Sequence, residues 1–384
     1  MTAMPRVSIV MSVYNGLPYL PAAFDSILNQ TFTDFEFVVI DDSSTDGSEA
    51  LLREYAASDA RVVLVRNERN LGLVTSLNKG LALTRGEYIA RQDADDISLP
   101  QRLEKQVAFL DSHPAVGLLG TLTQVIDAQG QPVHGTGHFM PLTDNAALQA
   151  QLLRNNPFCH GSVMLRRICL ERSGPYDPRA ITEDYELWLR LAEVTELAKV
   201  EPVLYLYRVH SGALSLSISP RVYMDSARVL GDTLQRRFGA APPVEHLAAI
   251  AHHYLRAAQA AYRRNELELA CQAVRQALAL SPSLFGSSEL LSELESVYLP
   301  DRPFASGQAF TQMIFSGLPP DPATDRLRGR LLSTLHMREV FQGAAARDWA
   351  RVRAHIAPGL RLDPRWRLNR GVWVIWLKAL AGAR

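Results

Sequence analysis

The feature of this sequence that most constrains its fold is a series of consecutive apolar runs in the first hundred residues. The runs lie at 6–14, 35–44, 61–67 and 87–96. The segments that follow them, at 19–32, 48–58, 70–83 and 99–114, are spaced like amphipathic helices. Strands that are continuously apolar are buried on both faces, as in a parallel sheet covered by helices. The pattern predicts an α/β, Rossmann-like fold with a mainly parallel sheet and helices on both faces.

The pattern becomes mixed after residue 115 and mostly helical from about residue 221. Further strands are expected at 116–127, 131–139, 158–167 and 199–210, with a helix at 181–194. We therefore predict three parts, an α/β domain at 1–220, a helical region at 221–318 and a helical tail at 319–384.

The helical region contains one candidate repeat unit at 251–282. Ala258, Ala270, Ala277 and Pro282 stand where a tetratricopeptide-like helix pair places its small residues and closing proline. Only one such unit is visible, so a solenoid is not supported. The Pro-rich segment 316–322 is the clearest linker candidate.

Charge is distributed unevenly along the chain. Net charge is zero over 384 residues, yet Pro320–Arg384 carries thirteen Lys/Arg and five Asp/Glu, about +8, and four of the five tryptophans. Segment 365–384 mixes Arg, Trp and aliphatic residues at helical spacing. Two interpretations stay open: an interfacial helix that contacts an anionic membrane, or a helix that packs on its own domain with a basic solvent face.

The remaining composition indicates a reducing environment and no membrane span. Cys159, Cys169 and Cys271 have no metal-ligand spacing and are expected as core thiols. No stretch approaches 18 apolar residues, and residues 1–16 resemble a first strand rather than a signal peptide.

The first strand–helix turn, SVYNGLPY, excludes two common nucleotide enzymes. It lacks the G-x-G-x-x-G that a dinucleotide pyrophosphate needs for close approach, and the chain contains no G-x-x-x-x-G-K-[ST] phosphate loop. A dehydrogenase and a P-loop enzyme are therefore disfavoured.

Acidic residues gather where two neighbouring strands end. Asp41 and Asp42 follow the second strand, and Asp93, Asp95 and Asp96 follow the fourth. Ligands bind outside the carboxyl ends of strands in an open parallel sheet, and like charges this close repel unless a cation or backbone N–H groups receive them. Asp-x-Asp at a strand end would put two carboxylates on one side of the chain, which suits Mg²⁺ or Mn²⁺ holding a diphosphate. Ser43, Ser44 and Asp46 are explained by caps and turns.

Six segments together resemble the family 2 glycosyltransferases of the GT-A fold. They are VSIVMSVYNG, FEFVVIDDSSTDGS, NLGLVTSLNKGLALTRGEYIARQDADDISLPQRLEKQ, HGSVMLRR, TEDYELWLRL and YRVHSGALS, in order over roughly residues 5 to 215. The resemblance implies a nucleoside-diphosphate sugar as donor and inversion of the anomeric centre by one in-line displacement.

The resemblance also implies roles for individual residues. The first loop (Ser12, Val13, Tyr14 and Asn15) and Asp42 match positions that hold the base and ribose of the donor. Asp93, Ala94 and Asp95 match the family's D-x-D, whose two carboxylates hold the metal, with Asp95 the more direct ligand and Asp93 nearer the ribose. Asp184 matches the catalytic base, and Glu183 beside it either supports the acceptor or is a first-turn acid.

Basic and histidine residues complete the expected site. His210 matches a position near the metal and diphosphate, where it is either a metal ligand or phosphate contact or an ordinary polar residue at a strand end. His160 matches a histidine on the wall of the site. Arg208, Arg91 and Lys79 are candidate partners for phosphate or for the acids.

The predicted function is an inverting, Mn²⁺- or Mg²⁺-dependent glycosyltransferase acting on a polysaccharide, glycolipid or related acceptor. A UDP-sugar is favoured, because the matched base-binding acid suits uracil. Location is expected to be cytoplasmic, with peripheral contact at the inner face of the plasma membrane through the tail, and no nucleic-acid partner is expected. The alternative is a catalytically silent nucleotide-sugar-binding scaffold. A nucleotidyltransferase would need a Gly-rich basic loop after the first strand, which SVYNGLPY does not supply.

Overall fold

The computed structural model describes residues 4–133, 141–212, 219–280, 284–285, 288–297, 303–316, 318 and 321–381. The chain divides into two compact units, one of Met1–Ile218 with Val229–Arg237 and one of Ser219–Arg228 with Phe238–Arg384. Helix α8 (Pro220–Phe238) contributes to both, so this division falls inside a helix rather than at the predicted boundary of 220/221.

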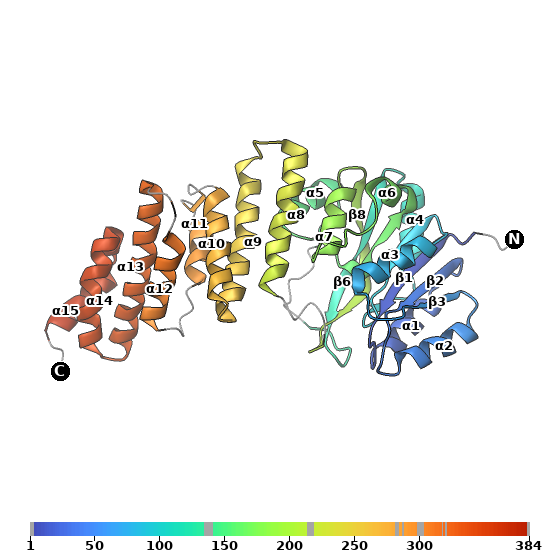
Figure 1. The fold of residues 1–384 in the computed structure, drawn as a ribbon, viewed down its shortest axis with the longest axis horizontal. Coiled ribbons are helices and arrows are strands. Elements are labelled where there is room, and N and C mark those ends of the chain that lie inside the picture. The colour runs from blue at the N-terminus through green and yellow to red at the C-terminus, as the bar shows by residue number, and fades with distance from the viewer. Residues whose placement is uncertain are drawn as a thin grey trace. The chain divides into compact units, whose positions relative to one another are not determined.

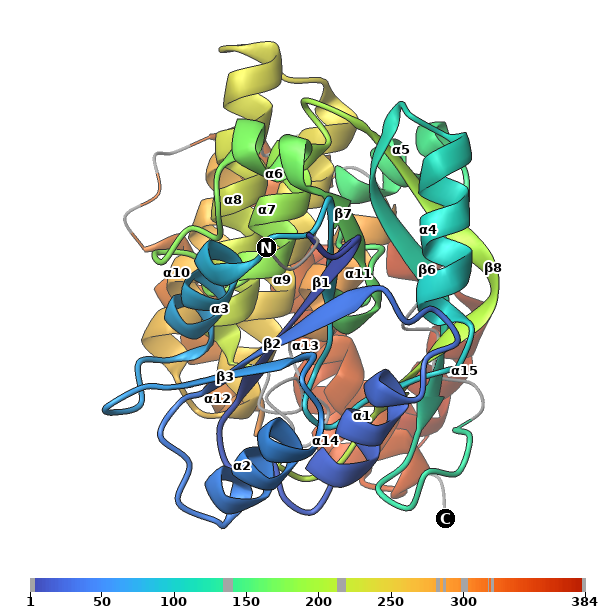
Figure 2. The ribbon, with the colours of Figure 1, turned by 90° about the vertical axis from the view of Figure 1, so that its right-hand side faces the viewer.

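The first unit is built on a mixed sheet with the order β3-β2-β1-β4-β7-β6-β8-β5 (Figures 1 and 2). Its strands are β1 Val7–Val13, β2 Phe35–Asp41, β3 Val62–Arg66, β4 Tyr88–Arg91, β5 Ile97–Ser98, β6 Val116–Ile126, β7 Met164–Arg166 and β8 Glu196–Arg208. Strands β3, β2, β1 and β4 are parallel, whereas β7 runs antiparallel to both β4 and β6. The prediction of a mainly parallel α/β sheet is confirmed.

Helices cover both faces of this sheet. The helices of the first unit are α1 Leu20–Leu28, α2 Ser48–Ser58, α3 Leu73–Leu83, α4 Arg102–Ser112, α5 Asn145–Leu152, the 3-10 helix η1 His160–Ser162, α6 Arg167–Ser173 and α7 Glu183–Leu191. One core cluster joins alternate residues of β1, such as Ile9 and Met11, to α1, α2 and α4. The opposite face meets α3, where Gly80 lies so close to Val10 that a Cβ would be 2.7 Å from its Cγ1.

Three sequence-based boundaries differ from the structure. The strand expected at 87–96 ends at Arg91, and Asp93–Asp96 lie in the turn that follows, so the pleat argument for the two carboxylates was wrong. The strand expected at 158–167 is split between η1 and β7 because the chain turns at His160–Ser162. Of the strand expected at 131–139, Pro132 forms an isolated bridge with Ile126, and the rest lies mainly outside the described residues.

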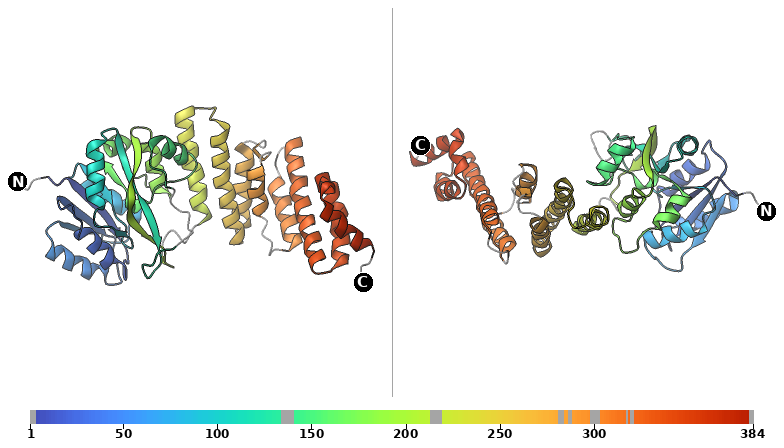
Figure 3. Two further views of the ribbon diagram at one scale, coloured as in Figure 1. Left: turned by 180° about the vertical axis from the view of Figure 1, so that it is seen from behind. Right: turned by 90° about the horizontal axis from the view of Figure 1, so that it is seen from above.

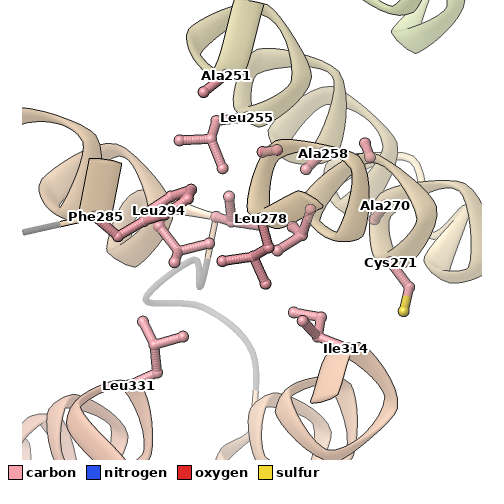
Figure 4. Packing of buried hydrophobic residues seen from close by; sticks show 14 of the residues in the cluster. Ala251, Leu255, Ala258, Ala270, Cys271, Leu278, Phe285, Leu294, Ile314 and Leu331 are labelled. Carbon is pink, nitrogen blue, oxygen red and sulfur yellow. The ribbon is translucent and has the colours of Figure 1, made fainter. Parts of the chain in front are cut away.

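The second unit is helical (Figure 3). Besides the first part of α8, its helices are α9 Val244–Arg263, α10 Leu267–Leu280, α11 Ser288–Ser296, α12 Phe304–Phe315, α13 Pro322–Ala345, α14 Trp349–Leu362, the 3-10 helix η4 Pro364–Leu368 and α15 Arg370–Leu380. Ala258, Ala270 and Ala277 are fully buried between α9 and α10, where small side chains let helices approach closely. Figure 4 shows Ala258, Ala270 and Leu278 in this core, together with Ile314 of α12 and Leu331 of α13. Pro282, the closing proline of the expected tetratricopeptide-like pair, lies outside the described residues, and that likeness stays a prediction.

Candidate active site

The site lies at the carboxyl ends of β1, β2 and β4, which are parallel neighbours. Ser12 and Val13 are the last residues of β1 and pair with Ile40 and Asp41 of β2. Tyr14, which follows, is 52% exposed. The strand register therefore brings the first predicted donor loop beside the first acidic cluster.

The loops after β1 and β2 are tied together by side-chain hydrogen bonds. Asn15 has a positive φ of 53°, its Oδ1 accepts from the Thr45 N–H at 2.8 Å, and its own N–H donates to Ser44 Oγ at 3.0 Å. Asp46 accepts from the N–H groups of Leu17 and Ser48. Ser44 and Asp46 thus perform the turn roles expected of them, and the first loop is held in one conformation.

Asp42 is buried, and both of its oxygens bond to the segment before α3. Oδ1 accepts from Asn67 Nδ2 at 2.7 Å and from the Leu71 N–H at 2.8 Å, and Oδ2 accepts from the Gly72 N–H at 2.9 Å. Lys79 Nζ donates to Asn67 Oδ1 at 2.8 Å, which extends the network. These contacts fix the 67–72 segment; the donor-binding roles of Asp42 and Lys79 stay predictions.

The turn after β4 contains an ion pair between a buried arginine and a partly exposed aspartate. Arg91 is 4% exposed, and its Nη2 lies 2.6 Å from Asp93 Oδ1. Burial raises the pKa of Asp93, Arg91 opposes the rise, and the Asp95 carboxylate adds to it. The Arg91 guanidinium therefore compensates the charge of Asp93, one of the three acidic residues of this turn.

Asp96 points inward and helps to anchor β8. Its Oδ1 accepts from the Arg208 N–H at 2.7 Å, and its Oδ2 is buried without a hydrogen-bond partner among the described residues. Burial, followed by the charges of Asp93 and Asp95, raises the pKa of Asp96 well above its usual range. The Arg208 guanidinium donates to the carbonyl oxygens of Asp95, Asp127 and Ala128. Arg208 thus braces the acidic turn, and its contact with phosphate stays a prediction.

Asp95 and His210 form the more exposed pair of the turn. His210 Nε2 lies 3.0 Å from Asp95 Oδ2, and the two side chains are 15% and 33% exposed. The Tyr19 ring lies 4.5 Å from the His210 ring, and the Arg208 guanidinium lies 4.8 Å from the Tyr19 ring centre. Ala94, between the two acids, packs against the core of the sheet. The structure therefore brings together the two residues for which metal ligation was predicted most directly.

These donors fit a hard divalent cation that is shared with a diphosphate. Mg²⁺ and Mn²⁺ typically take one or two carboxylates and complete their shell with water and phosphate oxygens, and a neutral imidazole also binds Mn²⁺. In the part of the chain that the structure describes, no group of three or more His, Cys, Asp or Glu side chains is arranged as a complete metal cage. Asp95 and His210 would supply two ligands to such an ion, which leaves its other coordination positions to water and to the phosphate oxygens of the substrate.

Asp184 lies at the start of α7 and accepts two hydrogen bonds. Its Oδ1 accepts from the Tyr185 N–H at 2.7 Å, and its Oδ2 accepts from Asn156 Nδ2 at 2.7 Å. Burial raises the pKa of Asp184 to about 6, although both hydrogen bonds oppose the rise. A carboxylate with such a pKa is ionised at neutral pH and still a stronger base than an exposed aspartate, as a general base requires. Sequence reasoning missed Asn156; its only signal was the NNP run just before the HGS motif.

Glu183 and His160 are neighbours in a second network. His160 Nδ1 lies 3.6 Å from Glu183 Oε1, and His160 Nε2 lies 2.8 Å from the Tyr176 hydroxyl. Burial, followed by the charge of Asp184, raises the pKa of Glu183 to about 8. Burial, followed by the charge of Arg91, lowers the pKa of His160 well below its usual range. At pH 7 both groups are therefore mainly uncharged, which leaves Asp184 as the ionised member. Tyr176 is a second residue that sequence reasoning missed.

Gly161 connects the acidic turn to α7. A Cβ on Gly161 would lie 1.8 Å from the Tyr205 hydroxyl and 2.6 Å from Asp93 Oδ2, so only glycine fits between them. The preceding residue, His160, meets Glu183. The helix η1 therefore has Asp93 on one side and the start of α7 on the other. It brings the acidic turn after β4 and the acids Glu183 and Asp184 into one site.

We expect Gly161→Ala to lower the free energy of unfolding by about 1–3 kcal/mol, because the added methyl overpacks a full site. It should also weaken donor binding by displacing Asp93. Thermal unfolding and calorimetric titration with UDP and Mn²⁺ measure the two effects. Gly329→Ala in α13 is the matched control, because its Cβ would meet nothing closer than 3.5 Å, and we expect a small gain in stability. Unchanged stability and affinity in Gly161→Ala would contradict the packing described here.

Comparisons with known proteins agree with this fold. The sequence model described as "Glycosyl transferase family 2" matches residues 8–172. Glycosyltransferase EpsE of Bacillus subtilis is 40% identical over 198 residues, which cover 50% of this chain and 69% of the relative. The amylovoran biosynthesis glycosyltransferase AmsE of Erwinia amylovora is 34% identical over 186 residues, 48% of this chain and 68% of the relative.

A solved structure shows the same fold. S. aureus TarS 1-349, in complex with UDP-GlcNAc, superposes with a TM-score of 0.52 at 17% identity, over 94% of this chain and 92% of that one. The mainly parallel α/β sheet and the match to TarS identify the fold as GT-A type. With the relatives at this identity and coverage, the chain belongs to glycosyltransferase family 2. The predictions of family, fold class and enzyme class are confirmed.

Proposed function

We propose that the protein transfers a sugar, with inversion, from a nucleoside-diphosphate sugar to a hydroxyl of a glycan acceptor. The observation that carries this proposal is that η1 joins the Asp93–Asp95 turn to Glu183 at the start of α7, next to Asp184. Such an arrangement presents a basic carboxylate opposite a group that can hold a diphosphate. Glu183, beside the base, is available to contact the acceptor.

Asp184 acts as the general base in this proposal. The acceptor oxygen forms its bond to the anomeric carbon while the bond from that carbon to the diphosphate oxygen breaks, and the hydroxyl proton passes to Asp184. The two hydrogen bonds from Asn156 and the Tyr185 N–H fix the orientation of the carboxylate. A fixed orientation matters because an in-line displacement needs the base and the leaving group on opposite sides of the reacting carbon.

Asp95 and His210 would hold a divalent cation together with the diphosphate of the donor, and Asp93 would face the ribose. When bound, that ion supplies Lewis-acid stabilisation of the negative charge on the leaving diphosphate. Arg91 keeps Asp93 in place through their ion pair.

A UDP-sugar is the proposed donor and a growing bacterial-type polysaccharide or lipid-linked glycan is the proposed acceptor. The structural neighbour TarS was solved with UDP-GlcNAc, and the name of the relative AmsE refers to amylovoran biosynthesis. Location in the cytoplasm, at the inner face of the plasma membrane, stays part of the proposal.

Donor hydrolysis tests this function without knowledge of the acceptor. The full chain is incubated with a panel of UDP-, GDP- and dTDP-sugars and Mn²⁺, and released nucleoside diphosphate is measured. We expect slow hydrolysis of one UDP-sugar, lost on chelation of the metal. Tight donor binding with no release from any donor, in the presence of a mixture of oligosaccharide acceptors, would instead support the scaffold alternative.

A further inference from the structure

Helix α15 is apolar on two opposite sides. On its inner side Val372 and Ala379 are fully buried, and they pack with α13 and α14 in one core cluster. On its outer side Val374, Leu377 and Leu380 are 51%, 64% and 65% exposed. A helix on the surface of a soluble domain normally presents polar residues outward, so the outer side of α15 is unusual.

The neighbouring aromatic and apolar residues extend this outer side. Leu368, at the end of η4, is 87% exposed, and Trp373 is 41% exposed. The Trp373 ring stacks on Trp376 with centroids 5.2 Å apart, and its indole N–H donates to the Arg367 carbonyl at 2.6 Å. We define the outer patch as Leu368, Trp373, Val374, Leu377 and Leu380.

The charged side chains within the segment that carries the outer patch are all positive. Segment 364–381 contains Arg365, Arg367, Arg370 and Lys378 and no acidic residue. Arg365 is paired with Asp363 at 2.7 Å, but among the described residues Arg367, Arg370 and Lys378 have no carboxylate partner. We call Arg367, Arg370 and Lys378 the cationic rim of the outer patch. An apolar surface with such a rim is complementary to a surface that is apolar within and anionic at its edge.

We propose that the outer patch inserts into the headgroup region of a bilayer that contains anionic phospholipid. Tryptophan prefers this interface, and each Lys or Arg near an anionic membrane strengthens binding about fivefold. At 11 residues α15 is about 16 Å long, about half of the hydrocarbon thickness, so it lies in the plane of the interface. In the described part of the chain no helix is long and apolar enough to cross a membrane.

A second copy of the chain is a poorer partner for the same patch. A two-fold contact would place the cationic rim of one copy against the identical rim of the other. Like charges brought together in this way oppose association, whereas anionic lipid headgroups attract them. The charge pattern therefore favours a lipid surface.

This inference deepens the proposed location at the inner face of the plasma membrane by naming the surface that makes the contact. Its test is independent of the proposed sugar transfer, because vesicle binding needs neither donor nor acceptor. It also separates the two interpretations of the tail that the sequence left open. The helix does pack on its own domain, but the side that it leaves to solvent is apolar as well as basic.

Flotation of the full chain with vesicles tests the inference. We expect binding to vesicles of phosphatidylcholine with phosphatidylglycerol, little binding to phosphatidylcholine alone, and weakening with added salt. Leu377→Glu with Leu380→Glu should abolish binding, and Arg367→Glu with Arg370→Glu should weaken it by about 30-fold or more. All four side chains are exposed, so the variants should fold normally.

Arg256→Glu with Arg263→Glu is the control that matches the change in charge. Both residues are exposed on α9, away from the outer patch, and we expect lipid binding close to that of the parent protein. Equal binding to neutral and anionic vesicles, or full binding by the Leu377/Leu380 variant, would overturn the proposal. A concentration-dependent dimer that Leu377→Glu disrupts, with no lipid binding by the parent chain, would identify a second copy as the partner instead.

Discussion

Asp184→Asn is expected to lower kcat for sugar transfer by about 10²- to 10⁴-fold, because an amide does not take the proton of the acceptor hydroxyl. Binding of the UDP-sugar should change little, since Asp184 acts on the acceptor. Steady-state kinetics of diphosphate release and calorimetric titration of the donor measure the two quantities. A kcat within a factor of roughly three of the parent value would remove Asp184 from the mechanism, because a general base contributes far more.

The hydrogen bonds of Asp184 supply a matched control for this substitution. Both of its oxygens accept from donors, Asn156 Nδ2 and the Tyr185 N–H, so an amide N–H₂ at position 184 would face a donor. An unsatisfied buried donor costs about 1–3 kcal/mol, which would mix a loss of stability with the loss of chemistry. Asn156→Asp combined with Asp184→Asn restores a donor–acceptor pair. We expect this exchange to recover stability without recovering kcat.

The pH dependence of kcat/KM follows from the pKa of Asp184. The pKa of Asp184 is raised to about 6, and the base must be ionised. The value of kcat/KM should therefore be level above about pH 6 and fall roughly tenfold per pH unit below it. At pH 7, Glu183→Gln should lower kcat/KM less than Asp184→Asn does, because a pKa of about 8 keeps the Glu183 carboxyl mainly protonated. A profile that stays level to pH 5 would contradict the assignment of the base.

Asp95→Ala is the second substitution with a large expected effect. We expect about a 10³-fold loss of donor turnover, since a metal ion stabilises the leaving diphosphate by several kcal/mol and Asp95 is its proposed carboxylate ligand. The dependence of UDP binding on Mn²⁺ should disappear in the same variant. His210→Ala should give a smaller loss in the same direction, because Asp95 still supplies the charge.

Two comparisons make the Asp95 experiment specific. Asp34→Ala removes an exposed carboxylate of the same unit and should leave both turnover and Mn²⁺ dependence unchanged. Asp93→Ala should also destabilise the fold, because it leaves the buried Arg91 guanidinium without its ion-pair partner. If Asp95→Ala keeps full turnover and its response to Mn²⁺, the metal is held elsewhere or plays no part.

Much of the first unit was predictable because its signals are local. An apolar run such as 35–41 is buried on both faces in the structure, as its composition requires. The turn residues Ser44 and Asp46 also behave as their types suggest. Local signals failed where the chain changes direction, after Arg91 and at His160–Ser162, because tertiary contacts impose these turns and the adjacent sequence does not mark where the strand ends.

The residues that the sequence did not reveal are those that act through distant partners. Asn156 meets Asp184 across 28 positions, and Tyr176 meets His160 across 16. Asn and Tyr occur widely in loops, so nothing in their immediate neighbourhood distinguishes them. Gly161 was inside a recognised motif, but its importance depends on the Tyr205 hydroxyl and Asp93 lying within reach of a Cβ.

The sequence by itself determined the class of fold, the family and the strand ends at which acidic side chains collect. Those properties depend on apolar periodicity and on short motifs, which are written in consecutive residues. The tertiary structure alone decided that Asp95 meets His210 across 115 positions, that η1 joins the acidic turn to α7, and that the outer side of α15 is left to solvent. The physical reason is that hydrogen bonds and steric contacts act over about 3 Å, so they depend on how every element packs.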